Sequence, residues 1–402
     1  MSGVTDAVLW VHHAPLMTER LGGMGILERQ LFLLSSVGIK RVWIAGPEPA
    51  GAKEFRRPAG MEAAWIAHGA DLPVDCRHPY LGLSGDHLVR RETLESLAAE
   101  AREGHVSYQD EERRSVVQLI GSRGERVVLF AKKPMPAGSF ARLEPHGSRS
   151  AALRWLLEGA RKGHDGLMAR LFDRHLSLTA TRWLLDTRLK PNHMTLISSA
   201  IGLWGACQFA RPEHAGAVAG AALVWLHSVL DGCDGEMARL RYEESRLGGI
   251  LDFWSDNVVH IALFSAMGLG LSRRTGAAWP LVLGALAAAT SLAAAALAAR
   301  LAAARRAAGT AEPFFNGLTL DVPLSGGARI LQRVEDFLTQ RDFIYLLVLA
   351  ALCRKEDLFL IAAGIGTPLF LLILLYLTLQ TGALHGAAPK AAQTAASPRG
   401  PQ

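Results

Sequence analysis

The spacing of hydrophobic and polar residues changes near residue 190, and the two sides of this point predict different kinds of domain. Before it, short β-rich runs at 7–13 and 41–46 alternate with a helix-like stretch at 24–37. The other elements predicted in this half are a strand at 80–84, a helix at 91–102 and closing strands at 116–120 and 127–131. Alternating strands and helices favour a mostly parallel sheet, so we expect a soluble α/β domain over residues 1–150.

Long apolar runs dominate the chain after residue 190. A helix needs about 20 apolar residues to cross a bilayer. The candidate spans are 194–210, 214–232, 248–270, 277–299, 342–353 and 357–381, of which the fifth is short. We therefore expect an all-α, six-helix transmembrane domain over residues 191–384. The tail at 385–402 is rich in Ala, Pro, Gly and Gln, has no packing pattern and is expected to be disordered.

The segment between the two domains, residues 151–190, has an amphipathic character. Leucines and Trp183 are interspersed there with Arg170, Arg174 and Arg182. Such a segment fits the surface of a bilayer, with its apolar side towards the lipid. An ordinary helix packed on the soluble domain would show the same pattern, and both interpretations stay open.

Basic residues give an expected orientation in the membrane. Arginines are concentrated in the linkers that follow the second and fourth predicted spans, and fewer positive residues occupy the other linkers. Because cytoplasmic loops carry the excess of Lys and Arg, these two linkers and the first domain are expected in the cytoplasm. The first twenty residues lack the basic start, apolar run and cleavage site of a secretory signal, which agrees with that expectation.

Composition narrows the possible partners. The 402 residues carry a formal net charge of +6, with a pI near 9.3, and half of them are hydrophobic. The arginines lie beside apolar runs and not in a basic stripe interleaved with aromatic residues, so we expect a lipid bilayer and no nucleic acid as partner. The four cysteines are scattered without paired spacing, which excludes a disulfide framework or a zinc site.

Four aspartates stand at the ends of two predicted spans and need a physical explanation. Asp231 and Asp234 are three residues apart, and Asp252 and Asp256 are four apart, so each pair lies on one face of its helix. An ionised aspartate in a spanning helix costs about 2.5–3.5 kcal/mol on insertion scales. Cations held between the two faces would offset that cost. Carboxylate oxygens suit Mg²⁺ or Mn²⁺, and four of them can hold two ions.

Small residues and one arginine next to these aspartates indicate a phosphate site. Gly235, Ala238 and Gly248 lack the bulk that would keep a nucleotide or a second helix away from the backbone. Arg239 can donate forked hydrogen bonds to a diphosphate.

The spacing of these residues resembles a known family. The chain reads Asp, two residues, Asp-Gly, two residues, Ala-Arg, eight residues, Gly, three residues, Asp, three residues, Asp, and a Pro-Asn and a Thr precede the first span. This pattern resembles the CDP-alcohol phosphotransferases. The resemblance implies that metal binds to Asp231, Asp234, Asp252 and Asp256. It implies that the nucleotide is bound by Asn192, Thr195, Gly235, Ala238, Arg239 and Gly248, with Asp256 as the catalytic base.

The resemblance also implies a reaction and its partners. An acceptor hydroxyl would attack the β-phosphorus of a CDP-alcohol and release CMP at the cytoplasmic face, with Arg341 holding the acceptor and the chain forming a homodimer. The donor is CDP-inositol, giving a polar phosphodiester, or CDP-diacylglycerol, giving a phospholipid. The alternative of another class is a transporter or membrane scaffold, because carboxylates in spans also mark ion pathways.

The first domain resembles sugar-phosphate nucleotidyltransferases. The stretch from Gly22 to Arg29 is similar to the part of that family after its first loop, and Gly85-Asp86-His87 is similar to its metal-binding segment, which makes Asp86 a metal candidate. This domain order resembles bifunctional enzymes that make CDP-inositol and couple it to a second inositol phosphate. The family's glycine-rich loop is replaced here by residues 12–16, so an active cytidylyltransferase and a degenerate domain both stay open.

Overall fold

The computed structural model divides the chain into two compact units. One contains Met1–Arg161 with two short segments, Leu185–Thr187 and Leu240–Tyr242, and the other contains the remainder. The residues described are 4–49, 55–66, 79–100, 105–120, 131–144, 147, 149–160, 172–307 and 343–381. The predicted tail, the linker before the fifth span and Arg341 lie outside these residues.

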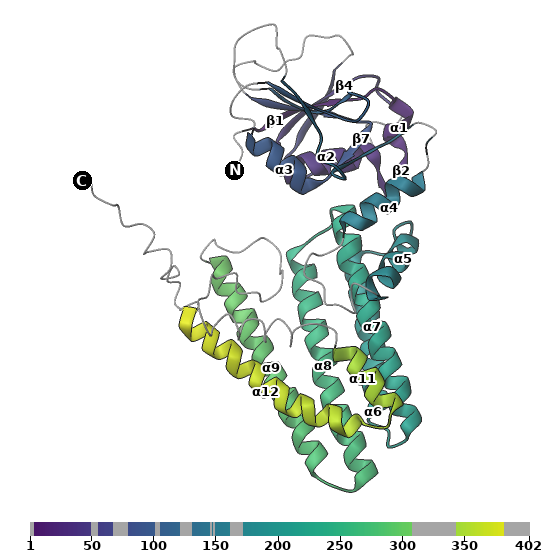
Figure 1. Ribbon diagram of the computed structural model, residues 1–402, viewed down its shortest axis with the longest axis vertical. Coiled ribbons are helices and arrows are strands. Elements are labelled where there is room, and N and C mark those ends of the chain that lie inside the picture. The colour runs from purple at the N-terminus through teal and green to yellow at the C-terminus, as the bar shows by residue number, and fades with distance from the viewer. Residues whose placement is uncertain are drawn as a thin grey trace, which may run out of the picture. The chain divides into compact units, whose positions relative to one another are not determined.

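A seven-stranded mixed sheet forms the centre of the first unit (Figure 1). The strand order is β10-β8-β9-β6-β1-β4-β5. The strands are β1 (Asp6–Trp10), β4 (Arg41–Ala45), β5 (Glu62–Ile66), β6 (Tyr80–Ser84), β8 (Val106–Gln109), β9 (Ser115–Ile120) and β10 (Ala131–Pro134). Strand β1 pairs in parallel with both β4 and β6, and β9 runs antiparallel to β6 and β8. The predicted α/β sheet is therefore present, with its parallel part around β1.

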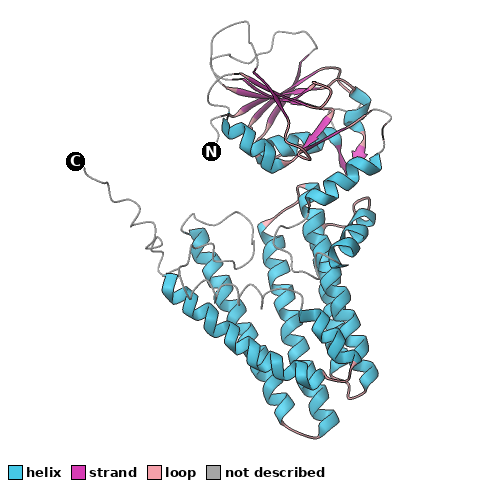
Figure 2. Cartoon of the chain, in the orientation of Figure 1, coloured by secondary structure: helices cyan, strands magenta, loops and turns pink. Residues whose placement is uncertain are grey.

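Helices cover this sheet, and two small ribbons flank it (Figure 2). The helices are α1 (Ala14–Thr18), α2 (Ile26–Ser36), α3 (Arg91–Glu100) and α4 (Arg149–Gly159). The ribbons are β2 (Arg20–Leu21) with β3 (Met24–Gly25), and β7 (His87–Val89) with β11 (Phe140–Arg142). Leu9, Leu31, Leu83 and Leu94, from two strands and two helices, are buried in one core. Removing such apolar side chains from water is the main force that holds the layers together.

A buried polar group lies at one end of β6. His87 Nδ1 is 3.1 Å from Ser84 Oγ, and its Nε2 is 3.3 Å from Asp110 Oδ2. Burial lowers the pKa of His87, and the neighbouring Asp110 only partly opposes this. Burial works against ionisation of Asp110 as well, but hydrogen bonds from Arg114 and His87 outweigh it and lower the pKa of that carboxyl. His87 is therefore favoured as neutral and Asp110 as charged.

The second unit is built of helices only, within the residues described. They are α5 (Arg174–Leu184), α6 (Pro191–Phe209), α7 (His214–Arg241), α8 (Arg246–Thr275), α9 (Trp279–Ala307), α11 (Phe343–Leu352) and α12 (Glu356–Thr381). Figure 1 shows α6 to α9 running along a common direction, with α12 crossing them obliquely. Helix α8 packs on α6 and α9, and α12 packs on α9.

Six of these helices coincide with the six predicted spans. Three of them are long and apolar enough to cross a membrane: His214–Arg241, Trp279–Ala307 and Glu356–Leu379. Helix α11 is apolar but has only 10 residues. The apolar helical half is thus present, while the expectation that all six helices span the bilayer stays a prediction.

Glycines allow the helices of this unit to approach one another closely. A Cβ atom on Gly268 would lie 2.7 Å from the Pro280 carbonyl oxygen, and one on Gly284 would lie 2.6 Å from the Phe264 carbonyl oxygen. Gly270 is tighter still, because its Cβ would come within 1.9 Å of the Phe209 carbonyl oxygen. Packing of α8 on α6 and α9 therefore depends on the absence of side chains at these positions.

One side of α12 carries large apolar side chains that no part of the described chain covers. They are exposed at a spacing of three or four residues, as on one face of a helix. These residues are Leu358, Ile361, Ile365, Leu369, Leu372, Leu375 and Leu379. Such a face is expected where a helix meets lipid or another copy of the chain.

Candidate active site in the helical unit

The turn between α7 and α8 brings the four motif aspartates to one end of the helical unit. Helix α7 ends at Arg241, and Tyr242 has the left-handed backbone (φ 51°) that reverses the chain. Ser245 then caps α8, its hydroxyl accepting a hydrogen bond from the Gly248 amide at 3.0 Å. Because α8 starts at Arg246, Gly248, Asp252 and Asp256 follow at four-residue steps along one helical face.

Three of the aspartates converge. Asp231 from α7 and Asp252 and Asp256 from α8 each offer a carboxylate oxygen, and these oxygens all lie within 4.8 Å of one another. Asp231 is buried, with 1% of its surface exposed. Three carboxylates this close repel one another strongly when ionised, and a divalent cation is the usual way to relieve such repulsion. The donor set of oxygens alone fits Mg²⁺ or Mn²⁺ and does not favour zinc.

Asp234 is placed differently from the other three. Its carboxylate accepts hydrogen bonds from the Thr195 hydroxyl and from the Gly235 amide, and it is not part of the three-carboxylate group. Thr195 lies in the first turns of α6, so this contact connects α6 to α7. The prediction that Asp234 also binds metal is not tested by this geometry and stays a prediction.

A cleft with a cavity volume of about 90 Å³ lies beside the aspartates. All six residues predicted to bind the nucleotide line it, together with two of the predicted metal ligands. The lining consists of Pro191, Asn192, Thr195, Asp234, Gly235, Ala238, Arg239, Glu243, Glu244, Ser245, Gly248, Gly249 and Asp252. The structure thus brings together residues that lie up to 61 positions apart in the sequence.

Two glycines keep this cleft open. A Cβ atom on Gly248 would lie 3.0 Å from Asn192 Oδ1, and one on Gly235 would lie 3.1 Å from an Arg239 guanidinium nitrogen. Larger residues at either position would push against a predicted nucleotide contact. The small residues in the motif are therefore explained by the approach of Asn192 and Arg239 to the helix backbones.

Two residues near the site were not predicted from the sequence. His227 lies one turn before Asp231, and its Nε2 is 3.5 Å from Asp256 Oδ1. Glu236, inside the motif, is fully buried and bound by residues of α5. For His227, the signal available in the sequence was its four-residue spacing from Asp231, which places both on one helical face.

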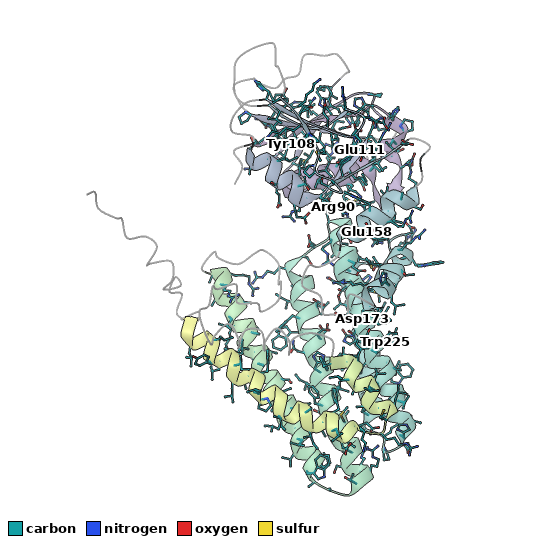
Figure 3. The ribbon with its side chains drawn as sticks, viewed as in Figure 1. Arg90, Tyr108, Glu111, Glu158, Asp173 and Trp225 are labelled. Atoms are coloured by element: carbon teal, nitrogen blue, oxygen red, sulfur yellow. The ribbon has the colours of Figure 1, made fainter. Side chains whose placement is uncertain are left out.

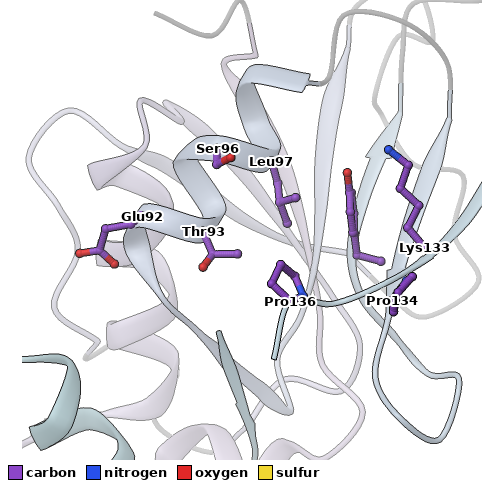
Figure 4. Close-up of a pocket in the computed structure, with 8 residues that line it drawn as sticks. Glu92, Thr93, Ser96, Leu97, Lys133, Pro134 and Pro136 are labelled. Atoms are coloured by element: carbon purple, nitrogen blue, oxygen red, sulfur yellow. The ribbon is translucent and has the colours of Figure 1, made fainter. Parts of the chain in front are cut away.

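The predicted site residues in other places are less well supported. The Asp86 carboxylate in the first unit has a buried oxygen without a hydrogen-bond partner, but Asp86 belongs to no group of three or more potential metal ligands among the described residues. One hollow of that unit lies between α3 and strands β8 and β10 (Figure 4). Glu92 and Lys133 are the charged residues that line it. This lining does not form a metal or phosphate site, because one carboxylate and one ammonium stand among mostly uncharged groups.

Comparison with known proteins addresses the motif directly. Residues 188–325 match the family model for CDP-alcohol phosphatidyltransferases. A protein from Rubrobacter xylanophilus named bifunctional IPC transferase and DIPP synthase is 38% identical over 141 residues, which are 35% of this chain and 31% of that protein. The protein of the same name from Aquifex aeolicus is 31% identical over 121 residues, 30% of this chain and 27% of that one.

A solved structure is also similar to part of the chain. It is the Mycobacterium tuberculosis phosphatidylinositol phosphate synthase PgsA1 with CDP-DAG bound, at 21% identity and a TM-score of 0.34, covering 50% of this chain and 94% of that one. The chain spans about a third of the length of the curated relatives it matches. The resemblance predicted from the motif is confirmed over one segment, because residues 188–325 match the family model for CDP-alcohol phosphatidyltransferases.

Proposed function

We propose that the chain is a metal-dependent CDP-alcohol phosphotransferase of the membrane. It would move a substituted phosphate from a CDP-alcohol to an acceptor hydroxyl and release CMP. One observation carries the proposal: the cleft lined by all six predicted nucleotide residues adjoins the three carboxylates that lie within 4.8 Å of one another. A transporter or scaffold needs acidic residues in its helices, but it does not need a cleft lined by the predicted nucleotide residues beside them.

The carboxylates would hold the metal, and the cleft would hold the nucleotide. Asp231, Asp252 and Asp256 are the ligands that the geometry favours, with Asp234 reaching the same ions from the cleft side. A bound divalent ion would supply positive charge for the phosphate oxygens of the donor. Arg239, which lines the cleft, would donate hydrogen bonds to the diphosphate.

Asp256 would act as the base. Its side chain is 29% exposed, so an acceptor can reach a carboxylate that also faces Asp231 and Asp252. In the proposed step, the acceptor oxygen forms a bond with the β-phosphorus, and its proton passes to the Asp256 carboxylate. The bond between that phosphorus and the oxygen of CMP breaks, and CMP leaves with the bonding electrons.

The relatives favour a polar donor. Both curated proteins are named IPC transferase and DIPP synthase, which points to CDP-inositol as donor and an inositol phosphate as acceptor. A phospholipid synthase acting on CDP-diacylglycerol is the alternative within the same chemistry. Insertion in a bilayer, with the site at the cytoplasmic face, and a homodimeric state belong to the same proposal.

The test is an assay of CMP release by the purified full chain in detergent. CDP-inositol with inositol phosphate, and CDP-diacylglycerol with either inositol phosphate or glycerol phosphate, are offered in separate reactions with Mg²⁺, Mn²⁺ or EDTA. We expect metal-dependent CMP release with CDP-inositol and loss of that release in the Asp252→Asn variant. The matched control, Asp186→Asn, changes an exposed aspartate outside the site and is expected to leave the rate unchanged.

Two outcomes would contradict parts of the proposal. Release from CDP-diacylglycerol alone would replace the donor but keep the chemistry. Absence of metal-dependent release with every donor would favour the transporter or scaffold.

A further inference from the structure

Glu236 is an acidic residue of the motif segment on α7 that belongs neither to the cleft nor to the three-carboxylate group. Its side chain is fully buried, and both carboxylate oxygens are bound. Oε1 accepts hydrogen bonds from Arg174 Nη1 and from the Ser177 hydroxyl, each at 2.8 Å, and Oε2 accepts one from the Thr181 hydroxyl at 2.6 Å. All three donors belong to α5, so Glu236 is the point where α5 is fixed to α7.

The same helix turns its apolar side chains outward. Leu176 is exposed and Trp183 is 77% exposed, and Phe172, just before the helix begins, is also exposed. The donors to Glu236 occupy the opposite, buried face. Figure 3 labels Asp173 just before α5, and this carboxylate accepts a hydrogen bond from the Tyr345 hydroxyl of α11. The polar face of α5 is therefore held inside the unit at two points, and its apolar face is free to lie on a lipid surface.

Because Glu236 and the aspartates lie on the same helix, the hydrogen bonds between Glu236 and α5 also affect where the aspartates point. Successive residues of an α-helix are about 100° apart, so Glu236 lies roughly 200° from Asp234 around the helix axis. One side of α7 thus presents Asp231 and Asp234 to the site, while the other side is fixed to α5 through Glu236. A rotation of α7 that moved its aspartates would have to break the contacts of Glu236.

We propose that Glu236, through its pairing with Arg174, is a positioning residue that fixes the rotation of α7 and so the convergence of the metal-binding aspartates. The inference rests on the proposed function for its effect on catalysis. Its effect on metal binding can be measured without any turnover. Replacing residues that orient metal ligands without touching the metal commonly changes metal affinity or activity by about 10- to 100-fold.

The pairing suggests a set of four variants. Glu236→Gln keeps one acceptor oxygen, for either the Ser177 or the Thr181 hydroxyl, and leaves the Arg174 guanidinium without its carboxylate. Arg174→Gln leaves the opposite charge unpaired, and the double variant removes both charges together. An uncompensated buried charge perturbs a site more than the loss of the whole pair does. Arg182→Gln is the matched control, since Arg182 lies on the same helix but is exposed.

The experiment is a titration of the detergent-purified full chain with Mn²⁺, followed by electron paramagnetic resonance. We expect Glu236→Gln and Arg174→Gln each to weaken Mn²⁺ binding about tenfold. The double variant should return to within threefold of the parent chain, and Arg182→Gln should not differ from it. In the CMP assay, Glu236→Gln should lower kcat and leave the donor KM within twofold, because Glu236 does not line the cleft. Should Glu236→Gln fail to fold, Thr181→Val, which removes one hydrogen bond and keeps the ion pair, should weaken Mn²⁺ binding two- to threefold.

Several results would overturn the inference. Unchanged Mn²⁺ affinity in folded Glu236→Gln, or in Thr181→Val where that variant is the one tested, would refute positioning. A loss of activity that only followed the folded fraction would make Glu236 a purely structural residue. A double variant as weak as the single ones would exclude the pair as the cause. If the parent chain binds Mn²⁺ but releases no CMP from any donor, the proposed function fails while the titration still decides the role of Glu236.

Discussion

Replacement of Asp252 by asparagine should separate two properties of the three-carboxylate group, namely the electrostatic repulsion between its members and its role in the activity. Asp252 takes part in two of the three close carboxylate pairs. At 4.8 Å and an effective dielectric constant of about 20, each ionised pair repels by about 3.5 kcal/mol before side-chain rotation or proton uptake relieves it. Without metal, the parent chain carries this repulsion. Asp252→Asn removes most of it and should therefore make the metal-free protein more stable, although it inactivates the site.

Thermal unfolding in detergent measures this effect. If about 2 kcal/mol of the repulsion survives relaxation, the unfolding midpoint in EDTA should rise by about 5 °C in Asp252→Asn, at roughly 2–4 °C per kcal/mol for a unit of this size. Added Mn²⁺ should raise the midpoint of the parent chain and have little effect on the variant. The exposed control Asp186→Asn should follow the parent chain in both conditions. Equal midpoints in EDTA, together with the same Mn²⁺ response in both proteins, would show that the carboxylates neither repel nor bind an ion.

Three further predictions concern other parts of the chain. Arg239→Gln should raise the donor KM at least tenfold in the CMP assay, because it removes a charged hydrogen-bond donor from the cleft, and an unchanged KM would exclude contact with the diphosphate. Gly270→Ala should lower the stability of the helical unit by about 1–3 kcal/mol, since its Cβ would meet the Phe209 carbonyl oxygen, whereas Gly366→Ala, with open space around its Cβ, should not; equal unfolding midpoints would argue against close packing of α8 on α6. The pKa of His87 is lowered from its ordinary value of 6.5 by burial, so its contribution to stability is present above about pH 6.5 and is lost as the pH falls below that value; unfolding midpoints of the parent chain and His87→Gln between pH 8 and 5 should show a steeper acid loss in the parent.

The sequence predicted that the motif carboxylates would meet. The spacing of Asp231, Asp252 and Asp256 was sufficient for this, because two helical faces joined by a short turn have few ways to meet. The strand at Tyr80–Ser84 was predicted with its observed bounds, and the helix after it ended within two residues of the predicted end. Strand β5 was missed, since Glu62–Ile66 contains two alanines and an acidic residue and lacks the β-branched pattern.

The sequence could not show which polar residues form hydrogen bonds with another helix. Glu236 stands between two motif residues, and nothing in its spacing indicates that its partners are on α5. The distance between Asp256 and His227 likewise depends on how α7 and α8 pack.

The uncovered apolar face of α12 has a practical consequence for anyone who handles this protein. The seven large apolar side chains exposed along this helix would associate between copies of the chain in water. Chains synthesised without lipid would therefore aggregate before they folded. Expression should therefore succeed only where newly made chains can insert into liposomes, nanodiscs or cell membranes. In buffer without detergent, the protein should elute from a gel-filtration column in the void volume, as aggregates do.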